Sequence, residues 1–144
     1  MHFLQQRGAH HLAVLGAVEV ELDDGTGYVL PDDLAPGEPP GDWEALLPSL
    51  DPAVMGWKDR SWFLGEHGLE LFDRNGNAGP TVWWNGRIVG GWGQLDSGGV
   101  VYELLEPVPS SVVERIDVEA TRLEAWLDGT VVKPRFPTPL EKRL

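Results

Sequence analysis

The residues best suited to specific chemistry lie in one stretch, 57–92, which holds five of the seven tryptophans. Guanidinium and carboxamide groups can contact phosphates or base edges, and indole rings can stack on bases or wedge between them. These residue types in one short stretch favour a DNA-contacting surface. The candidate residues are Lys58, Arg60, Arg74, Asn75, Asn77, Trp83, Trp84 and Arg87.

The same residues have a purely structural interpretation. Short polar side chains often bond to nearby backbone, so Arg74, Asn75 and Asn77 can simply fold their own loop. Asp59 and Asp73 would then neutralise the arginines. Both interpretations stay open at the level of the sequence.

Other kinds of active site find little support. The chain has no cysteine, which excludes a thiolate metal site, a disulfide framework and a cysteine nucleophile. His10 and His11 are adjacent, whereas two imidazoles share one helix face at a spacing of i, i+4. The sequence shows no phosphate-cradling loop with a lysine and no serine in a nucleophile elbow. No catalytic residue, metal or cofactor is therefore expected from these patterns.

The charge of the chain limits its partners. The formal net charge is −12 and the pI is about 4.5. A protein that binds nucleic acid without specificity needs a basic face, so the isolated chain does not fit that class. The stretch 57–92 is neutral, however, and the tail reverses sign, with Lys133, Arg135, Lys142 and Arg143 against Glu141. The sequence shows no signal peptide and no apolar run long enough to span a membrane, so a cytoplasmic location without membrane contact is expected.

The chain is expected to have three parts. Residues 1–33 read as a short helix followed by a hairpin over 18–31, which is the back half of a winged-helix domain. Residues 34–44 form a linker rich in proline, glycine and acids. Residues 45–144 form a barrel-like domain.

The elements of the barrel-like domain follow from local patterns. Asn85-Gly86 predicts a two-residue hairpin that pairs Trp84 with Arg87, Trp83 with Ile88 and Val82 with Val89. Gly90 and Gly91 indicate a bend or bulge.

The C-terminal part of that domain is expected to hold one long helix and a last strand. The helix is predicted over 110–128, with a capping box of Ser111 and Glu114. Its apolar stripe includes Trp126 as a core residue, and a strand over 131–136 follows. The predicted fold class is α+β: a small, mostly antiparallel β-barrel with one long C-terminal helix, preceded by a partial winged helix.

Several stretches, in one order, resemble the AlkZ-type DNA glycosylases, a family of bacterial winged-helix DNA-binding proteins. The similar stretches are 25–33, 46–52, 55–60, 72–77, 80–82, 86–90, 134–136 and 138–140, so the resemblance covers roughly residues 16–142. It implies tandem winged helices followed by a C-terminal β-barrel, and in some members excision of alkylated bases or unhooking of interstrand crosslinks. The family's catalytic Gln-x-Gln motif belongs to its N-terminal region. Gln5-Gln6 lacks the spacer and does not match, so the chain alone is not expected to be active.

The sequence thus leads to one main hypothesis. The chain would be a DNA-binding or supporting module of a winged-helix DNA glycosylase-like protein in base-excision or crosslink repair. It would begin inside the last winged helix, as a truncated product, a misplaced start or a degenerate paralogue, and bind DNA weakly or only together with the missing winged helices. The alternatives are a structural barrel, or one that docks on a partner polypeptide or forms a homo-oligomer, and a complete enzyme that releases a base by itself.

Overall fold

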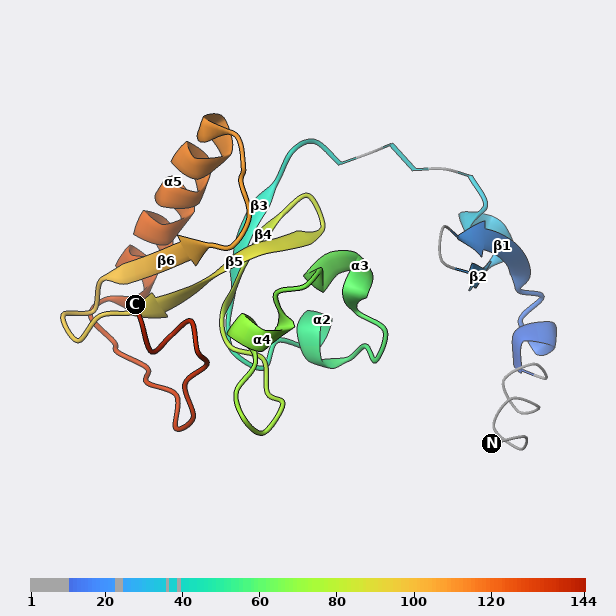
Figure 1. The fold of residues 1–144 in the computed structure, drawn as a ribbon. Coiled ribbons are helices and arrows are strands. Elements are labelled where there is room, and N and C mark those ends of the chain that lie inside the picture. Colours follow the sequence, from blue (N-terminus) through green and yellow to red (C-terminus); the bar gives the residue numbers. More distant parts are fainter. Residues whose placement is uncertain (1–10, 23–24, 36, 39) are drawn as a thin grey trace. The chain divides into compact units, whose positions relative to one another are not determined.

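The computed structural model describes residues 11–22, 25–35, 37–38 and 40–144. The chain divides into two compact units, Met1–Pro40 and Gly41–Leu144 (Figure 1). The stretch predicted as a linker includes this boundary, but its last residue, Glu44, is already the first residue of strand β3.

The first unit contains a two-stranded antiparallel hairpin. Strand β1 (Val18–Leu22) pairs with β2 (Gly25–Val29), with Val18 opposite Val29 and Leu22 opposite Gly25. A 3-10 turn, η1 (Pro31–Asp33), follows. The predicted hairpin is confirmed. Residues 1–10 of the predicted N-terminal helix lie outside the described residues, and the hairpin alone does not establish a winged helix.

The second unit is built on a four-stranded antiparallel sheet in the order β3-β4-β5-β6. Its strands are β3 (Glu44–Leu47), β4 (Thr81–Trp84), β5 (Arg87–Gln94) and β6 (Val100–Leu104). In the described part of the chain, β3 and β6 are its two edges and do not pair with each other, so the sheet is open. The predicted closed barrel is therefore wrong.

The strand predicted over 131–136 is also wrong, because a side chain takes the place of a partner strand. The amide of Gln94 donates to the carbonyl oxygen of Thr130 at 3.0 Å and accepts from the backbone N–H of Val132 at 2.9 Å. At Gln94 the backbone of β5 pairs with β6, whereas its pairing with β4 ends at Gly91. The segment after α5 therefore reaches β5 through Gln94 and forms no regular strand.

The central hairpin β4–β5 follows the prediction at its tip and departs from it one pair later. Asn85 and Gly86 have positive φ angles of 46° and 82°, and Trp84 lies opposite Arg87. The register then shifts, so that Val82 lies opposite Gly90 and not opposite Val89 as predicted. Such a bulge adds one residue to one strand and increases its local twist. Turn chemistry specifies the tip, and the shift lies beside Gly90 and Gly91, the two glycines that indicated a bend or bulge.

Helix α5 (Ser110–Leu127) covers one face of the sheet (Figure 1). Val112 and Ile116 of α5 are buried against Val82 and Val89 of the sheet. Trp126 is 79% exposed, so its predicted place in the core is wrong.

The predicted capping box of α5 is wrong as well. The helix begins at Ser110, with Pro109 at the N-cap and no side-chain cap bond. Ser111 therefore lies inside the first turn, where its hydroxyl cannot act as the N-cap. A capping box forms elsewhere, in the C-terminal tail. There the backbone N–H of Thr138 donates to Glu141 at 2.8 Å, and the N–H of Glu141 donates to the Thr138 hydroxyl at 3.1 Å.

Three short helices lie on the opposite face of the sheet (Figure 1). They are α2 (Pro52–Met55), α3 (Ser61–Leu64) and α4 (Gly68–Leu71). Asp51 caps α2, accepting from the N–H of Ala53 at 2.8 Å, and Pro52 occupies the first turn of the helix. The tail returns to this face and buries Leu140 completely in the cluster that holds Trp83 and Ile88. The tail thereby becomes a neighbour of the loop that follows α4.

Candidate functional site

The loop 73–77, which follows α4, is folded around the carboxylate of Asp73. One oxygen accepts the backbone N–H groups of Asn75 at 2.7 Å and Asn77 at 2.9 Å, and the other accepts the Asn77 side-chain amide at 2.9 Å. The hydrogen bond from the Asn77 backbone is the main cause that holds the pKa of Asp73 below its usual 3.8. Asn77 is therefore part of the loop's own structure, whereas the side chain of Asn75 is exposed. The loop is ordered before any ligand arrives.

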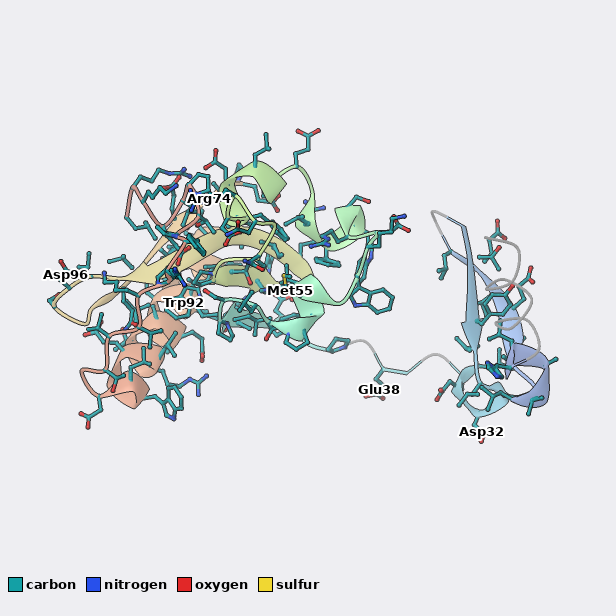
Figure 2. All side chains as sticks on the ribbon, turned by 90° about the horizontal axis from the view of Figure 1, so that it is seen from below. Asp32, Glu38, Met55, Arg74, Trp92 and Asp96 are labelled. Atoms are coloured by element: carbon teal, nitrogen blue, oxygen red, sulfur yellow. The ribbon has the colours of Figure 1, made fainter. Side chains whose placement is uncertain are left out.

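Three arginines lie on two phenylalanine rings around this loop. The guanidinium carbon of Arg74 is 4.8 Å from the centre of the Phe136 ring, and that of Arg135 is 5.4 Å from the same ring. Arg60 lies 5.0 Å from the ring of Phe72, the residue directly before Asp73. Figure 2 shows Arg74 beside α4 and the C-terminal segment. The three stacking contacts are therefore linked. Phe72 leads directly into loop 73–77, and Arg74 of that loop and Arg135 of the tail lie over the same Phe136 ring.

These arginines differ from the other arginines of the unit by their lack of an acidic partner. In the part of the chain that the structure describes, Arg60, Arg74 and Arg135 form no ion pair. The neutralised pairs are Arg87–Glu106 at 3.0 Å, Arg115–Glu44 at 2.7 Å, Arg122–Glu119 at 2.6 Å, Lys133–Asp96 at 3.2 Å and Arg143–Glu103 at 2.8 Å. The expected neutralisation of arginines by Asp59 and Asp73 does not occur among these residues, so three guanidinium groups without ion pairs lie around loop 73–77.

Arg87 and Trp84 belong to other sets of contacts. Arg87 shares the Glu106 carboxylate with His67, whose ring nitrogen lies 3.2 Å from it. Burial alone would raise the pKa of Glu106, but the hydrogen bonds from His67 and Arg87 outweigh it and lower the pKa. Trp84 is half-buried and packs against the cluster under α5. Its indole nitrogen is buried without a hydrogen-bond acceptor among the described residues.

The structure therefore gathers part of the predicted set and adds to it. Arg60, Arg74 and Asn75 lie around one loop, and Lys58 is exposed two residues before Arg60. Sequence reasoning selected neither Arg135 nor Phe136 for the site. The excess of basic residues in the tail is the feature of the sequence that could have identified Arg135.

Two further findings concern metal binding and membrane insertion. Among residues 11–22, 25–35, 37–38 and 40–144, no group of three or more histidine, aspartate or glutamate side chains is arranged to hold a metal ion. No helix within the same residues is both long and apolar enough to cross a bilayer.

The carboxylate of Asp73 makes the loop sensitive to acid. Because its pKa is lowered by folding, its contribution to loop stability is present above the unfolded value near 3.8 and is lost as the pH falls through the lower, folded value. We expect the amide proton signals of Asn75 and Asn77 to shift together in an NMR titration below pH 3.8. Asp73→Asn should abolish this step, because it keeps an acceptor oxygen but does not titrate. A common midpoint at or above the usual value would contradict the hydrogen-bonding account.

Comparisons with known proteins agree with this architecture. The model of the family described as DNA glycosylase AlkZ-like matches residues 5–126. A solved structure, the Streptomyces sahachiroi DNA glycosylase AlkZ, superposes with a TM-score of 0.57 at 24% identity, over 76% of this chain and 31% of that one. That likeness is one of fold, and the chain spans about a third of the length of the solved protein. No curated protein matches. Since the family model covers most of the chain, the protein belongs to the AlkZ-like DNA glycosylase family.

Proposed function

We propose that the chain is a DNA-engaging, non-catalytic module of a glycosylase-like protein that acts in base-excision or crosslink repair in the cytoplasm. The observation that carries the proposal is the set of three guanidinium groups, held on two phenylalanine rings and free of carboxylates, around an ordered loop. Because the chain belongs to a DNA glycosylase family, DNA is the proposed partner. In the same proposal, the β1–β2 hairpin is the wing of a winged helix.

Arg74 is the central contact in this proposal. Stacking on Phe136 fixes one face of its guanidinium, so the donor edge stays available for bidentate contact with a phosphate. Arg60 and Lys58 add phosphate contacts, and the exposed amide of Asn75 offers both a donor and an acceptor to a base edge. Asn77, Trp84 and Arg87 support the protein around the site, because their polar atoms are bonded within it or buried.

The net charge sets the expected strength of binding. At −12, the isolated chain repels the DNA backbone at long range, so measurable binding is expected at low salt and should fall steeply as salt rises. Fluorescence anisotropy with an alkylated duplex, at low and moderate salt, measures this directly. Absence of binding at both salt concentrations, with folded protein, would overturn the proposal.

A single substitution tests the position of the contact. Arg74→Ala is expected to weaken binding several-fold and to reduce the slope of log K against log salt by about 1, the effect of losing one phosphate contact. The melting temperature should fall only slightly, because Arg74 is exposed and loses only its stacking on Phe136, worth about 0.5–1 kcal/mol. Arg122→Ala is the matched control: it also removes one exposed arginine, but from α5. Equal effects of the two variants would show that only total charge matters.

Exposed apolar side chains favour a second candidate function, docking on a partner polypeptide or on another copy of the chain. Trp57 is 59% exposed, Trp62 of α3 is 62% exposed and Leu69 of α4 is 88% exposed. Exposed apolar groups of this size are typical of interaction surfaces when they form one patch. Sedimentation velocity at increasing concentration tests self-association, and Trp62→Ser should abolish it. A strictly monomeric protein at all concentrations would leave only a different polypeptide as the partner.

A further inference from the structure

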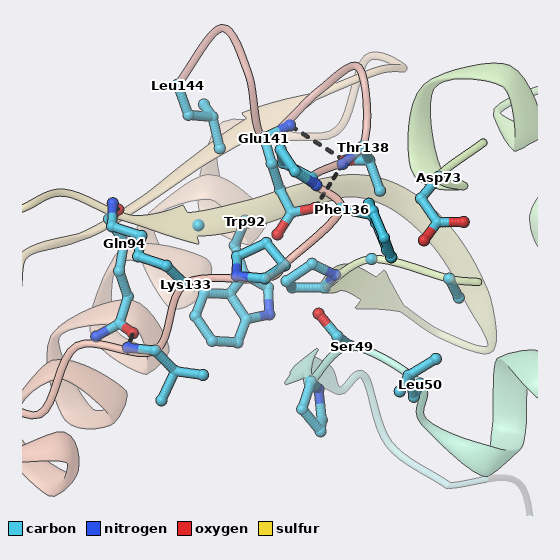
Figure 3. Close-up of a pocket in the computed structure, with 18 of the residues that line it drawn as sticks. Ser49, Leu50, Asp73, Trp92, Gln94, Lys133, Phe136, Thr138, Glu141 and Leu144 are labelled. Atoms are coloured by element: carbon cyan, nitrogen blue, oxygen red, sulfur yellow. Dashed lines mark hydrogen bonds between the residues drawn. The ribbon is translucent and has the colours of Figure 1, made fainter. Parts of the chain in front are cut away.

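A pocket of about 1000 Å³ opens in the second unit, on the side of loop 73–77 where the tail lies. It lies between the end of β3, strand β5, the C-terminal end of α5 and the tail 130–144. Figure 3 shows Ser49 and Leu50 on one side, with Thr138 and Glu141 of the tail on another. Its volume is at the upper end of the range for small-molecule sites.

The walls of the pocket are apolar and aromatic. Their main side chains are Leu46, Trp92, Leu123, Trp126, Leu127 and Phe136. The indole N–H of Trp92 donates to the carbonyl oxygen of Leu47 at 2.8 Å, which fixes the orientation of this ring. Trp126 lines the same pocket although 79% of its surface is exposed. An exposed tryptophan on a pocket wall offers a large flat surface with little entropy to lose on stacking.

The tail wall is held in place by hydrogen bonds from both sides. Gln94 clamps the backbone at Thr130 and Val132, and the capping box of Thr138 and Glu141 closes the turn beyond it. These hydrogen bonds give the tail wall a defined arrangement, and binding sites for small molecules are usually pre-formed in this way.

The lining holds three acids (Asp73, Asp96 and Glu141) and three bases (Lys133, Arg135 and Lys142), which differ in their partners. Asp73 and Glu141 use their carboxylates to accept backbone N–H groups, and Lys133 is paired with Asp96. Arg135 and Lys142 also line the pocket, and in the described part of the chain neither has a carboxylate partner. Two unneutralised cations beside aromatic walls are complementary to a flat molecule that carries a negative charge.

We propose that this pocket binds a small, planar aromatic anion. The ring system lies against Trp126, and its acidic group meets Arg135 and Lys142. The site shares Arg135 and Phe136 with the surface proposed to contact DNA, whereas Trp126 belongs to the pocket only.

Fluorescence titration with 8-anilinonaphthalene-1-sulfonate, an aromatic anion, tests the proposal on the full chain. We expect saturable binding of one molecule per chain. Trp126→Ala should weaken it at least fivefold, and so should the double variant Arg135→Gln/Lys142→Gln. Val118→Ala, at a 65% exposed position on the same helix outside the lining, is the control and should change it less than twofold. The neutral dye N-phenyl-1-naphthylamine should respond to Trp126→Ala but not to loss of the two cations.

Each outcome either supports or overturns the pocket as a binding site. Unsaturable staining, or equal effects of Val118→Ala and Trp126→Ala, overturns the pocket as a site. Displacement of the dye by 2′-deoxyadenosine 5′-monophosphate supports a nucleotide as the aromatic anion, and displacement by naphthalene-2-sulfonate alone supports an anion of another source. Trp126→Ala should leave duplex anisotropy unchanged within twofold, so failure of the pocket and failure of DNA binding are seen separately.

Discussion

Replacing Leu140 with alanine is expected to lower the free energy of unfolding by about 2–5 kcal/mol, the range for removing a fully buried leucine side chain. Leu140 is 0% exposed and packs in the cluster with Trp83 and Ile88. Its backbone N–H also donates to the carbonyl oxygen of Glu70 at 3.1 Å, which joins the tail to α4. Urea denaturation followed by tryptophan fluorescence measures the loss.

Val132→Ala is the matched control for Leu140→Ala. Val132 lies in the same tail but is 67% exposed, so its truncation should change stability by less than about 0.5 kcal/mol. Similar small losses in both variants would contradict the docked tail, and with it the wall it gives to the pocket and the Phe136 ring under Arg74.

Gly90→Ala is expected to be the most destabilising single methyl addition in the second unit, with a loss of at least about 3 kcal/mol. A Cβ at Gly90 would lie 2.2 Å from the carbonyl oxygen of Glu103 and 3.0 Å from the Cα of Leu104. Both atoms belong to the backbone of β6, so no side chain can rotate away and the two strands must separate. Thermal unfolding by circular dichroism measures the effect.

A second glycine provides the control for this clash. At Gly41 a Cβ would meet no atom within 4 Å, and its φ is not positive. Gly41→Ala should therefore change stability by less than about 1 kcal/mol. A Gly90→Ala variant that melts like Gly41→Ala would show that β6 does not approach β5 at Gly90 as closely as the structure has it.

Local chemistry explains which parts of the fold were predictable. Asn85-Gly86 specifies its turn because both residues accept positive φ, and Asp51 caps α2 because Pro52 occupies its first position. Two of the failures involve partners that are far away in the sequence. Nothing near Val132 shows that the side chain of Gln94 binds this backbone, and nothing near Val82 shows where the register shifts, although Gly90 and Gly91 indicated a bend or bulge.

The candidate site was also predictable only in part: local patterns identified some of its residues, but not the contacts between distant segments. Residue types and spacing selected Arg74, Asn75 and Arg60, and Asp73 was foreseen as their loop's acid, although it binds amides and not arginines. Stacking of Arg74 on Phe136 joins a loop to a tail that no periodicity connects. Ion pairing also depends on the fold, since it is Glu106, beyond β6, that neutralises Arg87.

The central claim is that DNA contacts the chain at loop 73–77 and the arginines around it. Titration of isotope-labelled protein with a short alkylated duplex at low salt, followed by ¹H–¹⁵N NMR, tests it most directly. The account predicts that the largest shifts occur at the backbone amides of Arg74 and Asn75 and at the side chains of Arg60, Arg74 and Arg135, and that they reverse as salt is added. Shifts that avoid these residues and cluster on α5 or on the β1–β2 hairpin, or no shifts at all, would contradict it.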